Sequence, residues 1–185
     1  MSKKIVAAGL ALAALTLAPY SANAAKSGNK VRVEDRCEAA SFNAAIGPGT
    51  CVGNGTTTFD EFLAKLNPVD FGDHHWRFKV SGGSTIKLGQ SISVVNTGGE
   101  FHTFTDVADP AGGCVPFIND ALGGLVPAPE CSDLIPGSDP PTPVAFATTG
   151  VTPLGGTLTV TPTTKGTHHY ICLIHPWMLT DVTVK

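Results

Sequence analysis

The chain has 185 residues, of which 15% are charged and 42% hydrophobic, and this suits one globular domain with a substantial core. Its 12 basic and 15 acidic residues give a formal net charge of −3, which argues against nucleic acid and anionic membranes as partners, because both need basic patches. Gly, Pro, Thr and Val are abundant, whereas the helix-favouring Glu, Lys and Arg are scarce. This composition predicts a mostly β protein.

Residues 1–24 have the pattern of a cleaved signal peptide. Lys3 and Lys4 precede an apolar stretch at 5–18, and small residues at 21–24 form a cleavage site. The apolar stretch is short for a membrane span and no second one follows, so we expect no stable membrane insertion. Cleavage removes two lysines, which leaves 12 − 2 = 10 basic and 15 acidic residues and a formal charge of −5. We expect the mature chain to be periplasmic or secreted.

The five cysteines form an odd set for an exported chain. Cys37 lies close to Cys51 in the sequence, and Cys114 lies close to Cys131. Pairing each couple as a disulfide leaves Cys172 over, although other pairings remain open because connectivity does not follow from sequence. A free thiol is a liability in an oxidising compartment unless a metal holds it.

Residues 25–75 are expected to form an N-terminal extension. A Gly-rich stretch at 47–55 has the composition of a loop. A short helix is expected at 59–66, because Thr58 and Glu61 can form a capping box and the apolar residues that follow share one face. The extension is therefore expected to hold one loop and one short helix.

Residues 76–185 are expected to form the main domain. Trp76, Phe78 and Val80 alternate with charged residues, as in a half-buried strand. A Pro- and Gly-rich insertion at about 108–149 separates two groups of strands, and so long a loop in an ordered domain is typical of a lid or a docking surface. Further strands are expected at residues 85–88, 91–95, 101–107, 157–161, 167–172 and 180–184. Short strands with turn signals between them predict an all-β, Greek-key β-sandwich.

A possible metal site lies near the C-terminal end of the chain. Cys172, His175 and Met178 follow one another at intervals of three residues, and Met178 is the only methionine after the leader. Thiolate, imidazole and thioether are the ligands that suit copper in both of its oxidation states. One more imidazole would complete a mononuclear site, and His102, on a different predicted strand, is the candidate.

Two segments resemble the metal-binding motifs of one protein family. Residues 166–178 are similar to the C-terminal motif of amicyanins, and residues 96–102 resemble an Asn-x5-His segment. The chain therefore resembles the cupredoxins, most of all the group of amicyanin, pseudoazurin and plastocyanin. The resemblance covers residues 76–107 and 155–185. Thr103 departs from it, because the family usually has an Asn there that joins the two ligand loops.

The resemblance implies a function as well as a cupredoxin-like fold. It implies one type 1 copper ion, bound by the four ligands His102, Cys172, His175 and Met178. Such a chain would be an exported blue copper protein that carries single electrons between redox partners, and not an enzyme. It would act as a monomer.

The resemblance also implies where redox proteins would dock. The edge of His175 would face the solvent, with Pro176 and Trp177 forming apolar surface around it. A small apolar patch suits brief association between partners.

Other functions remain open at this point. The main alternative is a periplasmic copper-binding module for copper storage, delivery or resistance, although such modules generally use exposed Met- or His-rich motifs. A catalytic copper domain is a further alternative, and so is a structural zinc site, although a thioether is a poor zinc ligand. The pair His168 and His169 is expected to be structural, and the pair His74 and His75 is a minor candidate for a second metal site.

Overall fold

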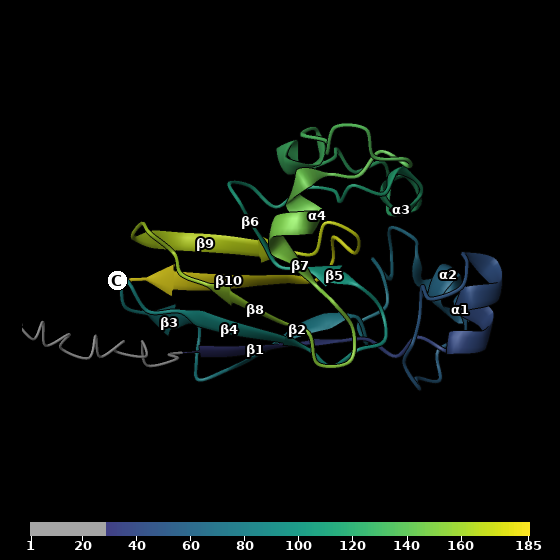
Figure 1. The fold of residues 1–185 in the computed structure, drawn as a ribbon, viewed down its shortest axis with the longest axis horizontal. Helices are drawn as coiled ribbons and strands as arrows, with labels where there is room; N and C mark the ends of the chain where they lie inside the picture. The colour runs from purple at the N-terminus through teal and green to yellow at the C-terminus, as the bar shows by residue number, and fades with distance from the viewer. Residues whose placement is uncertain (1–28) are drawn as a thin grey trace, which may run out of the picture.

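The computed structural model describes residues 29–185, so the expected signal peptide lies outside the described residues. Two four-stranded sheets pack into a sandwich, and a short two-stranded ladder lies at one end (Figure 1). The first sheet has the order β2 (Arg77–Ser81), β1 (Asn29–Glu34), β4 (Ile92–Asn96), β8 (Thr157–Val160). The second has the order β3 (Thr85–Ile86), β10 (Leu179–Val184), β9 (Gly166–Ile171), β6 (Thr105–Val107). The ladder joins β5 (His102–Thr103) to β7 (Gly150–Val151).

Alternating side chains explain how the sheets form a core. In β1, Val31 and Val33 are fully buried, whereas Lys30 and Arg32, which alternate with them, are exposed. The buried residues of the two sheets then meet between them, as the rings of Phe78 in β2 and Phe104 beside β6 do, edge to face with centroids 5.1 Å apart. The expected all-β sandwich is confirmed. Within residues 29–185, no helix has the length and apolar character needed to cross a membrane.

The segment expected to be an N-terminal extension contributes to the sandwich itself. β1 pairs antiparallel with β2 and parallel with β4, so it is an internal strand of the first sheet. Its alternation of Val with charged residues is the signal for a strand, which the expected boundary at residue 76 overlooks. The remainder of the extension forms α1 (Ala39–Ala45) and α2 (Phe59–Lys65). The predicted capping box at the start of α2 is confirmed.

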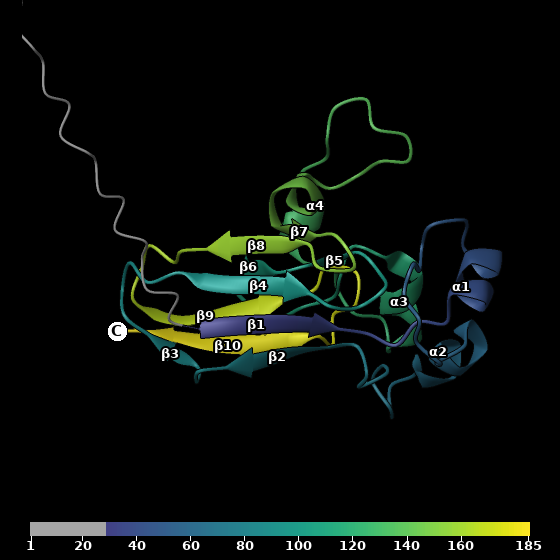
Figure 2. The same cartoon turned by 60° about the horizontal axis from the view of Figure 1, so that its bottom comes forward.

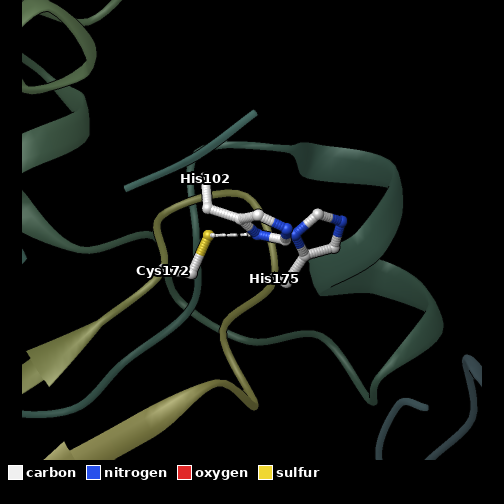
Figure 3. A group of neighbouring side chains, drawn as sticks. All are labelled: His102, Cys172 and His175. Atoms are coloured by element: carbon white, nitrogen blue, oxygen red, sulfur yellow. Dashed lines mark hydrogen bonds between the residues drawn. The ribbon is translucent and has the colours of Figure 1, made fainter. Parts of the chain in front are cut away.

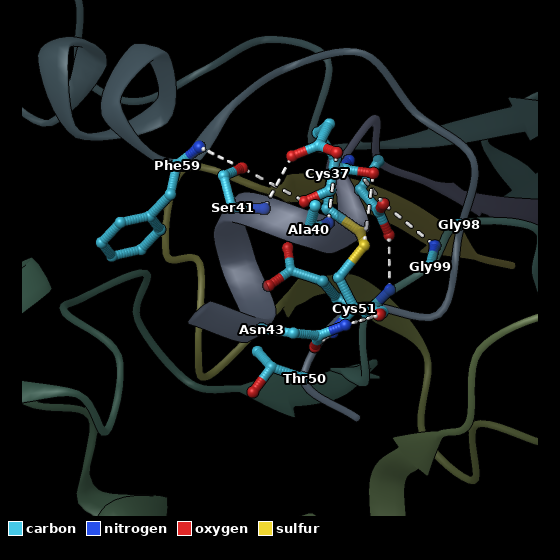
Figure 4. The surroundings of a disulfide bond; sticks show 12 residues. Cys37, Ala40, Ser41, Asn43, Thr50, Cys51, Phe59, Gly98 and Gly99 are labelled. Carbon is cyan, nitrogen blue, oxygen red and sulfur yellow. Dashed lines mark hydrogen bonds between the residues drawn. A yellow bond between two sulfur atoms is a disulfide. The ribbon is translucent and has the colours of Figure 1, made fainter. Parts of the chain in front are cut away.

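Both expected disulfides are present, and each holds a segment outside the sheets. Cys37 is bonded to Cys51, and Asn43 exchanges two hydrogen bonds with the backbone of Cys51, which fixes α1 to the loop after it (Figure 4). Cys114 is bonded to Cys131 in the long insertion. That insertion is not wholly irregular, because it contains α3 (Pro116–Ala121), the 3₁₀-helix η1 (Pro129–Cys131) and α4 (Val144–Thr149).

The helical segments gather around one end of the sandwich. In Figures 1 and 2, α1, α2 and α3 lie at the end opposite the C-terminus, beyond β5. The loop between β9 and β10 lies at the same end, and the backbone N–H of Cys114 donates to the carbonyl of Leu173 in that loop at 2.5 Å. The two segments that the sequence left unexplained therefore surround the loop that carries the candidate ligands.

Candidate metal centre

Backbone hydrogen bonds give the loop between β9 and β10 a compact shape. The N–H of Cys172 donates to the carbonyl of Met178 at 3.0 Å, and the N–H of Met178 donates to the carbonyl of His175 at 2.9 Å. These bonds hold the three candidate ligands of the loop in one turn at the end of the second sheet. His102 reaches the same place from β5, where it pairs with Val151 of β7.

The structure brings three of the four predicted ligands together. Nδ1 of His102 lies 3.7 Å from Sγ of Cys172, and Nδ1 of His175 lies 3.8 Å from the same sulfur (Figure 3). The three donor atoms all lie within 4.8 Å of one another. His102 and Cys172 are 0% exposed and His175 is 3% exposed. The cluster is therefore shielded from solvent and has its donor atoms facing one point.

The spacing of these donors fits one metal ion. With a metal–sulfur bond of about 2.3 Å, a metal–nitrogen bond of about 2.0 Å and an angle of about 120°, sulfur and nitrogen would lie about 3.7 Å apart. The two observed distances, 3.7 and 3.8 Å, match that separation. Two imidazoles and a thiolate in a trigonal plane form the blue-copper donor set.

Met178 closes the ligand loop and is 1% exposed. Its backbone is tied to Cys172 and His175, as described above, so the residue is fixed at the end of the cluster. Ligation by its sulfur stays a prediction.

A buried carboxylate holds His102 from the side away from the cluster. Oδ2 of Asp35 lies 2.9 Å from Nε2 of His102, and both side chains are almost fully buried. The carboxylate also accepts hydrogen bonds from the backbone N–H groups of Cys37, Gly99 and Glu100. Asp35 thereby fixes the orientation of the imidazole. No local pattern around Asp35 indicates this role, because only the pairing of β1 with β4 brings the residue to the site.

Thr103 joins the two segments that carry the ligands. Its hydroxyl oxygen accepts a hydrogen bond from the N–H of Leu173 at 2.8 Å, and its own N–H lies 3.5 Å from Sγ of Cys172. The short side chain of Thr103 therefore connects β5 to the ligand loop.

The electrostatics of the cluster favour a thiolate. Burial by itself would raise the pKa of Cys172, but hydrogen bonds from His102 and His175 lower it well below its ordinary value. Burial would lower the pKa of His102, but hydrogen bonds to Asp35 and Cys172 raise it to about 10. Burial raises the pKa of Glu100, the other acidic residue beside the cluster. The thiol proton is thus held weakly, as metal binding to sulfur requires.

The exposed edge expected for His175 is absent, and this expectation is wrong. The rings of Phe62, Trp76 and Trp177 lie 6.0, 6.4 and 5.3 Å from the His175 ring. The indole N–H of Trp177 donates to the carbonyl of Asp73 at 2.9 Å. The segment at 35–75, which the family motifs do not cover, packs over the ligand loop and takes its apolar surface out of solvent.

One glycine shows how closely this segment packs. A Cβ built at Gly72 would lie 2.2 Å from the ring of Trp177, and the backbone of Gly72 has a φ of +96°. Only glycine fits this conformation and this approach without a shift of the ring. The segment that contains Gly72 is therefore closely packed against Trp177.

The histidines at 168 and 169 form pairs with carboxylates. His168 pairs with Asp106 at 2.6 Å and His169 pairs with Asp181 at 2.7 Å, so both link neighbouring strands of the second sheet. Within residues 29–185, the pair at 74–75 forms no cluster that could hold a metal ion.

Comparison with known proteins gives no match to a protein-family model and none to a curated sequence. Among solved structures, a reduced amicyanin variant is 20% identical, covering 55% of this chain and 67% of its own, with a TM-score of 0.30. A purple cupredoxin from Nitrosopumilus maritimus is 15% identical, covering 84% of this chain and 98% of its own, with a TM-score of 0.34. Oxidised plastocyanin from Dryopteris crassirhizoma is 14% identical, covering 84% and 99%, with a TM-score of 0.36.

Proposed function

We propose that the chain is an exported type 1 copper protein that carries single electrons between redox partners. His102, Cys172, His175 and Met178 would be the residues that hold the ion. The observation that carries the proposal is the spacing of the three donor atoms in a buried cluster. The sulfur of Cys172 lies 3.7 Å from Nδ1 of His102 and 3.8 Å from Nδ1 of His175. Copper, when bound, would supply a reversible one-electron couple.

The residues around the cluster would keep its geometry nearly constant during electron transfer. Asp35 fixes the imidazole of His102, and Thr103 connects the two ligand segments. The rings of Phe62 and Trp76 pack beside that of His175. A site whose ligands are fixed by hydrogen bonds and packing needs little rearrangement when the charge of the ion changes, which favours fast electron transfer.

Burial of the donors favours a carrier over a module for copper storage or delivery. A protein that delivers copper must open its site to a receiving ligand, whereas His102 and Cys172 have no exposed surface. Release of a bound copper ion would require the segment that packs over the ligand loop to move away. We therefore place storage or delivery second.

The visible and EPR spectra of the mature chain with copper(II) test the proposal. We expect intense thiolate-to-copper absorption, a small copper hyperfine splitting and a reversible one-electron wave. Cys172→Ser should abolish the colour. As the control, replacing both Cys114 and Cys131 with serine removes a disulfide but no candidate ligand, and should leave the colour unchanged. A pale protein that still binds copper would contradict the type 1 assignment and favour storage or delivery.

Pro176 is buried, so the expectation that it forms apolar surface is wrong. We further propose that a redox protein docks on the surface beside Trp177, and that the chain is a monomer. The cover over His175 means that electrons would pass through Trp177, which is half-buried and lies 5.3 Å from the His175 ring. Trp177→Leu should slow electron transfer to the partner and leave the copper spectrum unchanged. An unchanged rate would contradict this docking position.

A further inference from the structure

A pocket lies beside the metal centre. Its volume is about 390 Å³, and its walls come from α1, α2 and the start of α3. Glu100 and His175 are part of its lining, and both are almost fully buried. The pocket thus connects the outer surface with one candidate metal ligand, at the place where the segments outside the sandwich meet.

The lining is mainly aromatic. Five of the nine phenylalanines of the chain face this pocket, namely Phe42, Phe59, Phe62, Phe101 and Phe117. Ile46 and Phe117 are more than half exposed, so the pocket opens between them. Its size lies in the range of small-molecule sites. A cavity of about 150 Å³ with similar walls is known to hold one benzene molecule.

One acidic side chain is the main polar group in this lining. Oε2 of Glu100 accepts a hydrogen bond from the indole N–H of Trp76 and lies 3.9 Å from Nε2 of His175. The second carboxylate oxygen can accept a hydrogen bond from a ligand. The lining contains no lysine and no arginine, so an anionic ligand would lack a partner and would be repelled by Glu100.

We propose that this pocket binds a small neutral aromatic molecule that carries a hydroxyl group. Its ring would lie among the phenylalanines and its hydroxyl would donate to Glu100, with one face against His175. Aromatic walls favour a planar ring through edge and offset contacts. A hydroxyl donating to a carboxylate gives a charge-assisted hydrogen bond, which sets the orientation of the ring.

Isothermal titration of the metal-free, disulfide-intact protein with phenol tests the proposal. We expect phenol to bind about tenfold more tightly than toluene, because only phenol can donate to Glu100. Cyclohexanol, which has the hydroxyl without the aromatic ring, and benzoate, which carries a negative charge, should both bind more weakly than phenol. Equal affinities for phenol and toluene would overturn the role of Glu100. Tighter binding of choline than of phenol would overturn the neutral class of ligand.

Two matched variants locate the binding. Ile46→Trp adds bulk at the mouth of the pocket and should weaken phenol binding at least tenfold. Val69→Trp introduces the same side chain at an exposed position outside the lining and should leave binding unchanged. Equal affinity in both variants would overturn the assignment to this pocket.

This inference is separate from the proposal of a copper carrier. Because the titration uses metal-free protein, its failure leaves the copper spectrum as an independent test of the electron carrier. Adding phenol to the copper-loaded protein gives a second readout, since a ligand against His175 should shift the visible spectrum. No shift, with saturated binding, would overturn the placement against His175.

Discussion

At the metal centre, two residues outside the ligand set hold the ligands in place. Asp35 binds the far nitrogen of His102, and Thr103 bridges β5 and the ligand loop. Such partners orient a ligand and raise its basicity, so they influence both metal affinity and reduction potential.

Asp35→Asn tests the first contact. An amide keeps the shape of the side chain but removes the negative charge next to His102. We expect copper(II) affinity to fall about 10–100-fold. The reduction potential should rise, because a nearby negative charge stabilises the more highly charged ion. Competition titration with a chelator and voltammetry measure the two effects.

The matched control is Asp181→Asn. Asp181 also pairs with a histidine, His169, but on the outer face of the second sheet. This variant should leave copper affinity and potential unchanged. If both variants behave alike, the effect at Asp35 is a general loss of charge and not a property of the metal centre.

Thr103→Val tests the second contact. Valine has nearly the same shape but cannot accept the hydrogen bond from Leu173, whose buried N–H would then lack a partner. We expect the free energy of unfolding to fall by about 1–3 kcal/mol. Chemical denaturation of the metal-free protein measures it, with Thr103→Ser, which retains the hydroxyl, as the control. A loss in the serine variant as large as in the valine variant would argue against this role.

At the level of elements, the disulfide from Cys37 to Cys51 holds the cover over the ligand loop. It closes a loop of 14 residues that contains α1. Replacing both cysteines with alanine should lower the free energy of unfolding by about 3 kcal/mol, by the chain-entropy account. Hydrogen exchange should increase in α1 and α2, and in the N–H groups around His175, more than in β9 and β10.

The second disulfide provides the comparison for this experiment. Replacing Cys114 and Cys131 removes a bond of similar span in the other segment. Increased exchange should then appear in the insertion, not in α1. If the two double variants gave the same exchange pattern, the segments would unfold together and not as separate covers.

The pair of His168 and Asp106 connects β9 to β6 and makes stability depend on pH. The hydrogen bond to Asp106 raises the pKa of His168 above its ordinary value. A raised pKa in the folded state stabilises the protein below the unfolded pKa of about 6.5. That stabilisation disappears as the pH rises through the raised value. Asp106→Asn should therefore lower stability by about 0.5 kcal/mol near pH 5.5 and have little effect near pH 9.

Thermal unfolding of the variant and the parent at the two pH values measures this dependence, and an NMR titration of His168 gives its pKa directly. A variant that loses the same stability at both pH values would contradict the electrostatic origin.

Most of the strands that carry these pairs were predictable from alternation. The strand expected at 101–107 is instead divided into β5 and β6, since His102 pairs with β7 and Thr105 pairs with β9.

For the molecule as a whole, net charge should control how two copies meet. Under the expected cleavage after residue 24, the formal charge would be 10 − 15 = −5, so two copies would repel each other at low salt. Under the proposed function, electron self-exchange should speed up as ionic strength rises from about 0.01 to about 0.1 M, because the screening length falls from about 30 to about 10 Å. NMR line broadening in mixtures of the two oxidation states measures the rate. A rate that falls with added salt would show attraction between local patches.

The sequence by itself determined the local features: strand alternation, the capping box of α2, the cysteine pairs as one choice among several, and three candidate ligands on one short loop. These depend on neighbours in the chain, so they can be predicted without knowing the fold. Only the tertiary structure decided that His102 meets Cys172 at 3.7 Å, that Asp35 supports it and that His175 is covered. Each of these depends on contacts between segments far apart in sequence, which form only when β1 enters the first sheet and α1 and α2 pack over the ligand loop.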